Sequence, residues 1–168
     1  MNFEFVKAQK EDCYKLSRIK KEVWLTTYRG IYSDEDLDNY DYLKHENKFI
    51  NGLDGLYLIR SNNNIIGYFN FSYPKYPYKD YKYCLNSLYI LQEFQGNGIG
   101  TKVFDFINEY CIENNINSYF TSANKYNNKA YSFYLKMGGI EECLEDEGID
   151  KSTHQYRIVF KVNKKSLN

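Results

Sequence analysis

The spacing of hydrophobic and polar residues divides the chain into seven strands and four helices, in the order βααβββαβαββ. Runs of alternating or continuous apolar residues predict strands at about 3–5, 55–60, 65–73, 83–91, 114–123, 140–146 and 154–162. Apolar residues three and four positions apart predict helices over about 12–28, 33–43, 103–114 and 126–139. Strands and helices interspersed in this way predict an α+β fold around a mixed sheet.

Two helix ends carry additional signals. Ser33, followed by an acidic run at 34–36, is typical of an N-cap and an acidic first turn. Gly138 and Gly139 end the last predicted helix, since glycine readily adopts the left-handed conformation that closes a helix. No repeat, linker or shift in composition interrupts the chain, so the sequence predicts one domain over residues 1–168.

Composition narrows the function classes. The 22 acidic and 22 basic residues balance, so no net field points to a nucleic acid or an anionic membrane as partner. No apolar stretch reaches the length of a membrane span, and the N-terminus lacks the pattern of a secretory signal. Four scattered cysteines favour free thiols in a reducing cytoplasm. His45 and His154 stand alone without metal-ligand spacing, so we expect no metal site.

The most informative stretch is Q-G-N-G-I-G-T at 95–101, which lies between an apolar strand and a helical pattern. It lacks the G-x-x-x-x-G-K-[ST] order of a P-loop, because Lys102 follows Thr101. It fits the first two glycines of a dinucleotide-binding G-x-G-x-x-G, but Thr101 stands at the third position. A glycine-rich turn with a purely structural role is the third interpretation, and the stretch alone does not exclude it.

A second motif lies downstream of this loop. Gln95-x-x-Gly98-x-Gly100 matches the pattern [QR]-x-x-G-x-[GA], and residues 127–138 match most of N-x-x-A-x-x-F-Y-x-x-x-G-F. Both patterns resemble signatures of the GNAT N-acetyltransferase superfamily, and W-L-T-T-Y-R-G-I at 24–31 resembles the first helices of a GNAT subgroup. The resemblance covers most of the chain. It implies the GNAT fold, an α/β three-layer arrangement whose mostly antiparallel seven-stranded sheet has splayed fourth and fifth strands.

The resemblance implies acetyl-CoA as cosubstrate. Backbone N–H groups of a glycine loop at a helix N-terminus bind phosphate oxygens, because glycine lets the ligand approach closely. In this family the pantetheine arm pairs like an added strand with the fourth strand, where a backbone N–H polarises the thioester carbonyl. The implied cosubstrate-binding residues are Leu88, Tyr89, Ile90, Gln95, Gly96, Asn97, Gly98, Ile99, Gly100, Thr101, Asn127 and Tyr134.

Within the second motif, the resemblance gives Tyr134 the catalytic role. A phenol, with a pKa of roughly 10, can donate a proton to the coenzyme A thiolate that leaves when an amine attacks. Asn127 is expected to cap its helix and to bond the coenzyme arm as well. Phe133 is expected in the core. Gly139 stands where the family usually has phenylalanine, which we expect to leave a smaller plug beneath the helix.

No general base stands out in the sequence. The positions at which some family members carry a glutamate correspond here to Cys84 and Ser122, and neither is a convincing base. A water chain to a more distant carboxylate is a further route, with Glu22, Asp34 and Glu35 as unranked candidates.

The resemblance places the acceptor beside the first two helices and the loop between the last two strands. The corresponding segments, 34–41 and 141–150, are acidic, which favours a small cationic amine such as a polyamine or an aminoglycoside. A solvated acidic surface explains the same pattern. Aromatic rings at 24, 28 and 32 are expected to add walls that hold a cation, although a buried core position is the favoured interpretation at 24. The acceptor-side candidates are Glu22, Trp24, Tyr28, Tyr32, Asp34 and Glu35.

Three function classes remain open. The first is an N-acetyltransferase that uses acetyl-CoA in a ternary complex, acting on a small amine or, alternatively, on a protein N-terminus or lysine. The second is a non-catalytic acyl-CoA-binding regulatory module, and the third is a tyrosine-rich interaction protein that kept only the fold. The tyrosine-rich stretch 73–83 has two interpretations, an acceptor lid or a contact in a homodimer.

Overall fold

The computed structural model describes residues 2–162, whose contacts form two compact units. Unit 1 comprises the described residues up to 72 together with 87–99. Unit 2 comprises 73–86 together with the described residues from 100 onward. The organisation of the whole chain as one domain stays a prediction.

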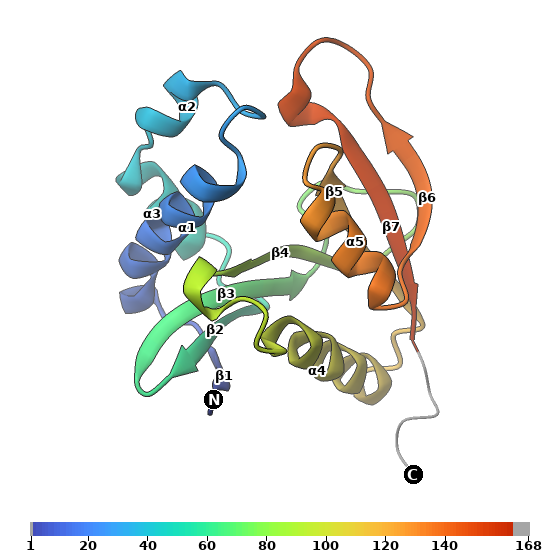
Figure 1. Cartoon of the computed structure of the whole chain (residues 1–168). Coiled ribbons are helices and arrows are strands. Elements are labelled where there is room, and N and C mark those ends of the chain that lie inside the picture. The colour runs from blue at the N-terminus through green and yellow to red at the C-terminus, as the bar shows by residue number, and fades with distance from the viewer. Residues whose placement is uncertain (1, 163–168) are drawn as a thin grey trace. The chain divides into compact units, whose positions relative to one another are not determined.

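The elements follow the predicted order, with one additional helix (Figure 1). The strands are β1 Glu4–Lys7, β2 Leu56–Ser61, β3 Asn64–Ser72, β4 Cys84–Ile90, β5 Ser118–Asn124, β6 Ile140–Glu145 and β7 Gln155–Lys161. The α-helices are α1 Cys13–Thr27, α2 Asp34–Asp38, α3 Tyr42–Ile50, α4 Ile99–Glu113 and α5 Asn128–Lys136. Short 3-10 helices occupy Lys10–Asp12, Gln92–Phe94 and Lys151–Thr153.

The strands form a seven-stranded sheet in the order β1-β2-β3-β4-β5-β7-β6. The pairs β1–β2, β2–β3, β5–β7 and β6–β7 are antiparallel, and β4–β5 is parallel. The β4–β5 register comprises only Cys84↔Phe120 and Leu85↔Thr121, whereas β5 pairs with β7 from Ser118 to Asn124. This short pairing confirms the predicted mixed sheet with splayed fourth and fifth strands.

The helical region before β2 differs from the prediction of one helix over about 33–43. The chain forms α2 and then, after a break at 39–41, the separate helix α3. Each helix has its own N-cap: the Ser33 side chain accepts from the Asp36 N–H, and the Asp41 side chain accepts from the Lys44 N–H. Asp41 therefore starts a new helix, because a side chain that bonds the N–H three residues later satisfies a donor that only a helix start exposes.

In unit 1, the predicted apolar face of α1 packs against the sheet. Leu16, Ile19 and Val23 are buried in one cluster with residues of β2 and β3 such as Leu58 and Tyr68. In Figure 1, α1 and α3 lie beside one another. The Tyr40 hydroxyl donates to the carbonyl of Ser17 at 2.8 Å, which ties the segment before α3 to α1.

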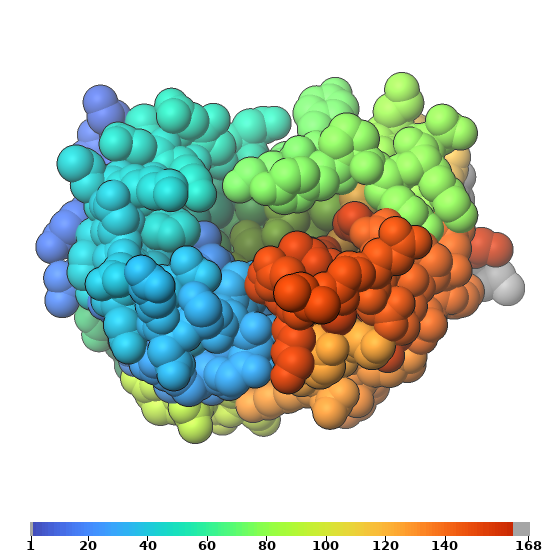
Figure 2. All heavy atoms as spheres, turned by 90° about the horizontal axis from the view of Figure 1, so that it is seen from above, coloured from blue at the N-terminus to red at the C-terminus, as the bar shows by residue number. Residues whose placement is uncertain are grey.

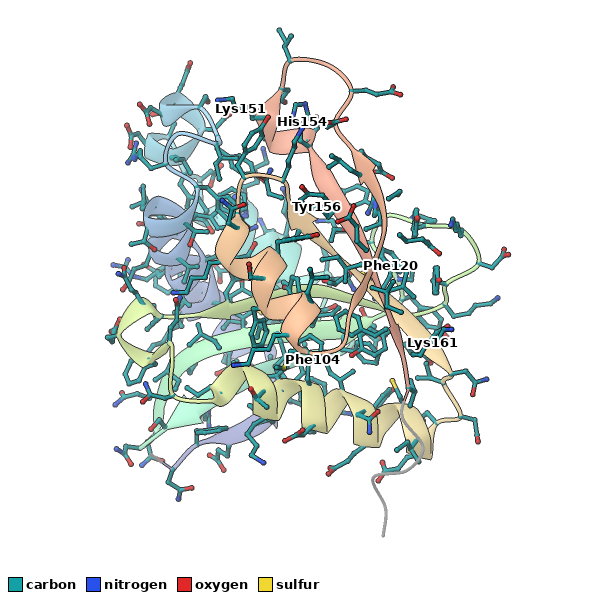
Figure 3. The ribbon with its side chains drawn as sticks, turned by 45° about the vertical axis from the view of Figure 1, so that its right-hand side comes forward. Phe104, Phe120, Lys151, His154, Tyr156 and Lys161 are labelled. Atoms are coloured by element: carbon teal, nitrogen blue, oxygen red, sulfur yellow. The ribbon has the colours of Figure 1, made fainter. Side chains whose placement is uncertain are left out.

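In unit 2, the two faces of the sheet have different covers. Phe160 of β7 contacts the rings of Phe104 in α4 and Tyr134 in α5, so these helices cover one face (Figure 3). On the other face Phe120 packs against Tyr78 and Tyr81 of the 73–83 loop. In Figure 2 this loop, in green, lies beside the orange-red segment that includes β6 and β7.

Gly139 lies at a crowded position beneath α5, and the neighbouring strand fills the expected space. A Cβ atom there would stand 2.5 Å from Ile158 Cγ2, 2.8 Å from Phe160 Cζ and 2.8 Å from the Tyr134 carbonyl oxygen. Side chains of β7 therefore occupy the volume in which the family's phenylalanine would need room.

We expect Gly139→Ala to lower the free energy of unfolding by about 1–3 kcal/mol, because the added methyl group overpacks this site. Urea denaturation monitored by circular dichroism measures the change. An unchanged transition midpoint would mean that β7 relaxes freely and that the contact is unimportant.

Candidate functional site

The glycine loop opens toward solvent at two of its glycines. Gly96 and Gly98 have φ angles of 79° and 77°, a conformation that glycine adopts without strain. A Cβ atom added at either residue would meet no other atom within 4 Å. Within residues 2–162, no protein acceptor bonds the backbone N–H groups of Gly96, Asn97 or Gly98. The loop therefore presents free N–H donors just before α4, which is the arrangement that binds phosphate oxygens.

Side chains of the loop hold its shape. Gln95 Nε2 donates to the carbonyl of Ile90 at 2.8 Å and so joins the loop to the end of β4. Asn97 Nδ2 donates to the carbonyl of Phe94 at 3.1 Å and of Gln95 at 3.3 Å. These two side chains therefore stabilise the conformation of the turn itself.

Gly100 is a glycine for a different reason. It is the second residue of α4, and a Cβ atom there would lie 2.7 Å from Cζ of Phe133. The first motif therefore contacts the second motif through this ring, in addition to any role in ligand binding. Ile99 beside it is buried and Thr101 is exposed in the first turn of α4.

The predicted arm-binding residues of β4 lie half-buried on a strand that approaches β3 closely. A Cβ atom on Gly67 would stand 2.4 Å from the carbonyl oxygen of Tyr89 and 3.1 Å from Cα of Ile90. Only glycine at 67 permits this approach. Leu88 precedes them on the same strand.

The two predicted residues of the second motif occupy different environments. Asn127 is the N-cap of α5, and its Oδ1 accepts from the Ala130 N–H at 3.1 Å, as expected. Tyr134 is only 8% exposed, and its ring contacts Phe104, Phe133 and Phe160. The packing fixes the orientation of this ring, which a proton donor requires.

Cys84 and Ser122 stand at the positions where some family members carry a glutamate base, and neither can act as a base. Burial raises the pKa of the Cys84 thiol to about 12, so this thiol stays protonated. Ser122 Oγ accepts from Arg157 Nη1 at 2.7 Å, and Arg157 Nη2 pairs with Glu145 at 2.7 Å. Sequence reasoning missed Arg157, because no motif marks an arginine whose partners come from two other strands.

The predicted acceptor-side rings form one cluster. Trp24, Tyr28 and Tyr32 contact one another with ring centroids 5.0–5.8 Å apart. Trp24 Nε1 donates to the Tyr89 hydroxyl at 3.2 Å, which brings an acceptor-side candidate to a cosubstrate-side candidate. The ammonium group of Lys20 lies 4.4 Å from the centroid of Trp24, so the protein's own cation already contacts this ring.

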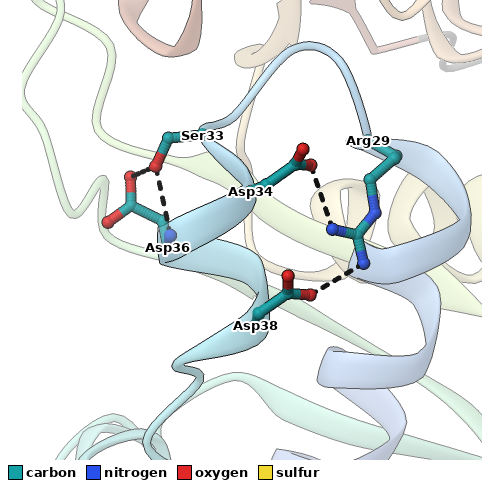
Figure 4. A network of polar contacts seen from close by, with 5 residues as sticks. All are labelled: Arg29, Ser33, Asp34, Asp36 and Asp38. Carbon is teal, nitrogen blue, oxygen red and sulfur yellow. Dashed lines mark hydrogen bonds and ion pairs between the residues drawn. The ribbon is translucent and has the colours of Figure 1, made fainter.

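The first acidic segment is largely engaged in local structure (Figure 4). Arg29 pairs with Asp34 at 3.0 Å and with Asp38 at 2.9 Å. The other two aspartates are Asp36, bonded to Ser33, and Asp41, the N-cap of α3. These contacts favour the structural interpretation of the segment over a free acidic surface, because each aspartate has a protein partner.

The second acidic segment is also largely paired. Its contacts join Glu141 with Tyr131, Glu142 with Lys79 and Tyr81, Glu145 with Arg157, Asp146 with Lys125, and Asp150 with Ser152. Lys79, Arg157 and Lys125 therefore compensate the charge of three of the six acids in this segment, within unit 2.

Glu22 and Glu35 are carboxylates at the surface of unit 1. Glu22 lines a shallow depression on α1 together with Tyr14, Arg18 and Ile19. Val23 and Ile19 of the same helix are buried in the sheet-facing cluster.

His45 lies among cations and rings of unit 1. Its ring stacks on Tyr40 at 4.2 Å between centroids, and its Nδ1 lies 3.1 Å from Lys20 Nζ. Burial, and next the charge of Lys20, lowers the pKa of His45 from 6.5 to about 4. His45 therefore stays neutral in the folded protein at neutral pH and accepts a hydrogen bond from Lys20.

This lowered pKa predicts a loss of stability on acidification. Between pH 6.5 and about 4 the unfolded chain binds a proton at His45 that the folded chain does not, so the free energy of unfolding falls as the pH decreases. We expect His45→Gln to flatten this part of the pH–stability curve, measured by urea denaturation at several pH values. Parallel curves for variant and wild type over this window would contradict the assignment.

Two further properties concern residues 2–162. Their helices all fall short of the length and hydrophobicity that a membrane crossing requires. No three histidine, cysteine or carboxylate side chains among them come together as a metal site would need.

Comparison with known proteins decides the family. A sequence model of the acetyltransferase (GNAT) family matches residues 16–139, which include both motifs and the ring cluster. The chain belongs to this family. The predicted family and enzyme class are thereby confirmed, and acetyl-CoA is the cosubstrate of GNAT enzymes. A search of curated proteins gave no match.

Solved structures with this GNAT fold resemble the chain over nearly its full length. The PaiA N-acetyltransferase of Thermoplasma acidophilum, solved in complex with coenzyme A, superimposes with a TM-score of 0.77 at 22% identity, covering 96% of this chain and 99% of that one. Ard1 from Thermoplasma volcanium gives 0.73 at 15% identity, covering 98% and 100%. An acetyltransferase from Thermus thermophilus gives 0.71 at 16% identity, covering 96% and 97%. These similarities confirm the fold.

Proposed function

We propose that this GNAT protein is a single-domain N-acetyltransferase that moves the acetyl group of acetyl-CoA directly to a primary amine in a ternary complex. The observation that carries the proposal is the glycine loop. Gly96 and Gly98 leave open space, and the N–H groups at 96–98 have no acceptor in the described residues. A coenzyme A complex of a structural neighbour supports the same ligand.

In this proposal the chain holds acetyl-CoA mainly through its backbone. The N–H groups from Gly96 to Thr101 bond the pyrophosphate, and the half-buried strand at 88–90 pairs with the pantetheine arm. Asn127, which caps α5 through Oδ1, keeps its Nδ2 for the same arm. Acetyl-CoA supplies an activated acetyl group and a thiolate as leaving group.

Tyr134 is proposed to donate the proton that the leaving thiolate needs. Its ring is held by three phenylalanines, so the hydroxyl has a defined direction. The amine must lose a proton before it attacks. Since Cys84 stays protonated and Ser122 accepts from Arg157, we propose that water carries this proton to a distant carboxylate.

For the acceptor we propose a small cationic amine of the polyamine or aminoglycoside kind. The rings of Tyr28 and Tyr32 support this choice, since aromatic faces attract ammonium groups. The surface carboxylates of Glu22 and Glu35 add negative charge on the same unit. The two acidic segments do not add to this support, because most of their carboxylates already bond protein groups.

A direct assay tests the proposal. Loss of the thioester is followed by absorbance with polyamines, aminoglycosides and short peptides as acceptors, without a thiol-reactive dye, because the protein has four free cysteines. We expect rapid loss with one small-amine class. Turnover with peptides alone would mean that the acceptor is a peptide or protein amine and not a small amine. Saturable acetyl-CoA binding without turnover on any amine would point to a non-catalytic binding module.

The compartment and the assembly are also proposals. Four free thiols, three of them buried, support the cytoplasm. Exposed Tyr73 and Tyr76 in the 73–83 loop support a homodimer contact, which sedimentation analysis would test.

A further inference from the structure

A network of polar groups, two of them buried, joins two segments of unit 2 that are distant in sequence. One is the β5–α5 turn at 124–127, which ends in Asn127, and the other is the 146–154 segment between β6 and β7. Three side chains make the central contacts, and we call Asn124, Tyr126 and His154 the clasp. Asn124 and His154 are 9% and 6% exposed, so their polar atoms depend on protein partners.

His154 bonds one segment with each ring nitrogen. Nε2 lies 3.2 Å from the carbonyl oxygen of Gly148, and Nδ1 lies 3.0 Å from the Tyr126 hydroxyl. A carbonyl oxygen only accepts, so Nε2 carries the hydrogen. In the neutral ring Nδ1 is then the acceptor, and the Tyr126 hydroxyl donates to it. The ring therefore bridges the 146–154 segment and the turn in one defined tautomer.

Asn124 makes the reciprocal connection. Its Nδ2 donates to the carbonyls of Lys151 and Ser152, while its Oδ1 accepts from the Tyr126 N–H at 3.0 Å. The Lys151 ammonium lies 5.4 Å from the centroid of the Tyr126 ring. Figure 3 shows Lys151 and His154 just before β7, with Tyr156 near the start of the strand.

The geometry places the clasp directly beside Asn127. The Asn127 N–H donates to the carbonyl of Asn124 at 2.9 Å, and the Lys125 N–H donates to the carbonyl of His154 at 2.9 Å. A ligand that bonds Asn127 and steadies this turn therefore also steadies the groups that hold 146–153. By linkage, a conformation of 146–153 that stabilises the turn raises the affinity for that ligand by the same factor.

We propose that His154 is a positioning residue that transmits coenzyme A binding at Asn127 to the 146–153 segment through the Tyr126 hydroxyl. The inference rests on the proposed function, because it takes Asn127 as a coenzyme contact. It adds a coupling between the coenzyme side and a segment that does not itself hold the coenzyme. It also gives the histidine a role that its isolation in the sequence does not reveal.

Hydrogen–deuterium exchange with and without saturating coenzyme A tests the coupling. In wild type, coenzyme A is expected to slow exchange of the 146–153 amides by at least about fivefold. Tyr126→Phe keeps the ring and removes only the donor to His154, at a side chain that is 38% exposed, so the variant folds. In this variant, we expect the ratio of the exchange rates without and with coenzyme A to fall to about twofold or less.

The control is Tyr131→Phe, which removes a phenol hydrogen bond between α5 and Glu141 of β6 without touching the clasp. It should keep the wild-type ratio. Two results would overturn the coupling but not the proposed function. One is a Tyr126→Phe variant in which coenzyme A slows exchange as much as in wild type, and the other is wild-type exchange at 146–153 that does not change when coenzyme A binds. Failure of wild type to bind coenzyme A in calorimetry overturns the proposed function and the coupling with it, so the two failures are distinguishable.

Discussion

Tyr134→Phe is expected to lower kcat for acetyl transfer by about 10²-fold and to leave the affinity for acetyl-CoA nearly unchanged. The phenylalanine ring fits the same contacts with Phe104, Phe133 and Phe160, so the helix and the packing persist. In the proposed mechanism, the variant lacks the proton that the phenol gives to the leaving thiolate. Steady-state rates from thioester absorbance, together with calorimetric titration of acetyl-CoA, separate the two quantities.

Tyr131→Phe is the matched control for this prediction. It makes the same chemical change one turn earlier in α5, where the hydroxyl bonds Glu141. Its kcat should stay near that of wild type. If Tyr134→Phe retains the wild-type kcat, another group or water donates the proton, and Tyr134 is a packing residue.

Gly98→Ala is expected to weaken acetyl-CoA binding by about 10-fold or more. The protein itself has room for the methyl group, since no atom lies within 4 Å of the added Cβ. The methyl group would instead stand in the space through which phosphate oxygens reach the N–H groups at 96–98. Calorimetric titration of the variant with acetyl-CoA measures the loss.

Gly138→Ala separates ligand contact from backbone strain. Gly138 has a φ angle of 89° and, like Gly98, no atom within 4 Å of an added Cβ, but it ends α5 and is not part of the glycine loop. Both variants should lose about 1–2 kcal/mol of unfolding free energy from the left-handed conformation. Only Gly98→Ala should lose affinity for acetyl-CoA. Equal affinities in the two variants would mean that the glycine loop is not part of the binding site.

The motifs predicted the fold and the two ends of α5 because their spacing reflects local geometry. Asn127 caps α5 and Gly138 closes it, as the pattern indicated. Helix α3 was missed although Asp41 is a good N-cap, and none of its residues is fully buried. Propensity alone does not separate two short helices from one interrupted helix.

The causes behind individual motif residues needed the structure. The sequence treated the three glycines of the loop alike, yet Gly96 and Gly98 have left-handed backbones and Gly100 makes room for Phe133. Gln95 holds the carbonyl of Ile90, a contact that no spacing rule predicts. Such roles depend on residues that meet only after the chain has folded.

Charge and isolated polar residues were the least predictable. The acidic segments indicated an attractive surface, but most of their carboxylates have protein partners, and cations such as Arg29 and Lys79 compensate part of the charge. His154 carried no signal in the sequence, because its partners Tyr126 and Gly148 come from segments that only the sheet brings together. Tertiary contacts therefore decided both cases.

The most direct test of acetyl transfer is to follow both products of one reaction. Protein, acetyl-CoA with an isotopically heavy acetyl group and a polyamine are incubated together, and mass spectrometry measures the acetylated amine against the free coenzyme A released. We expect one heavy acetyl group on the amine for each thioester lost. Thioester loss without an acetylated amine, or bound acetyl-CoA that stays intact with every amine tested, would contradict direct transfer to an amine.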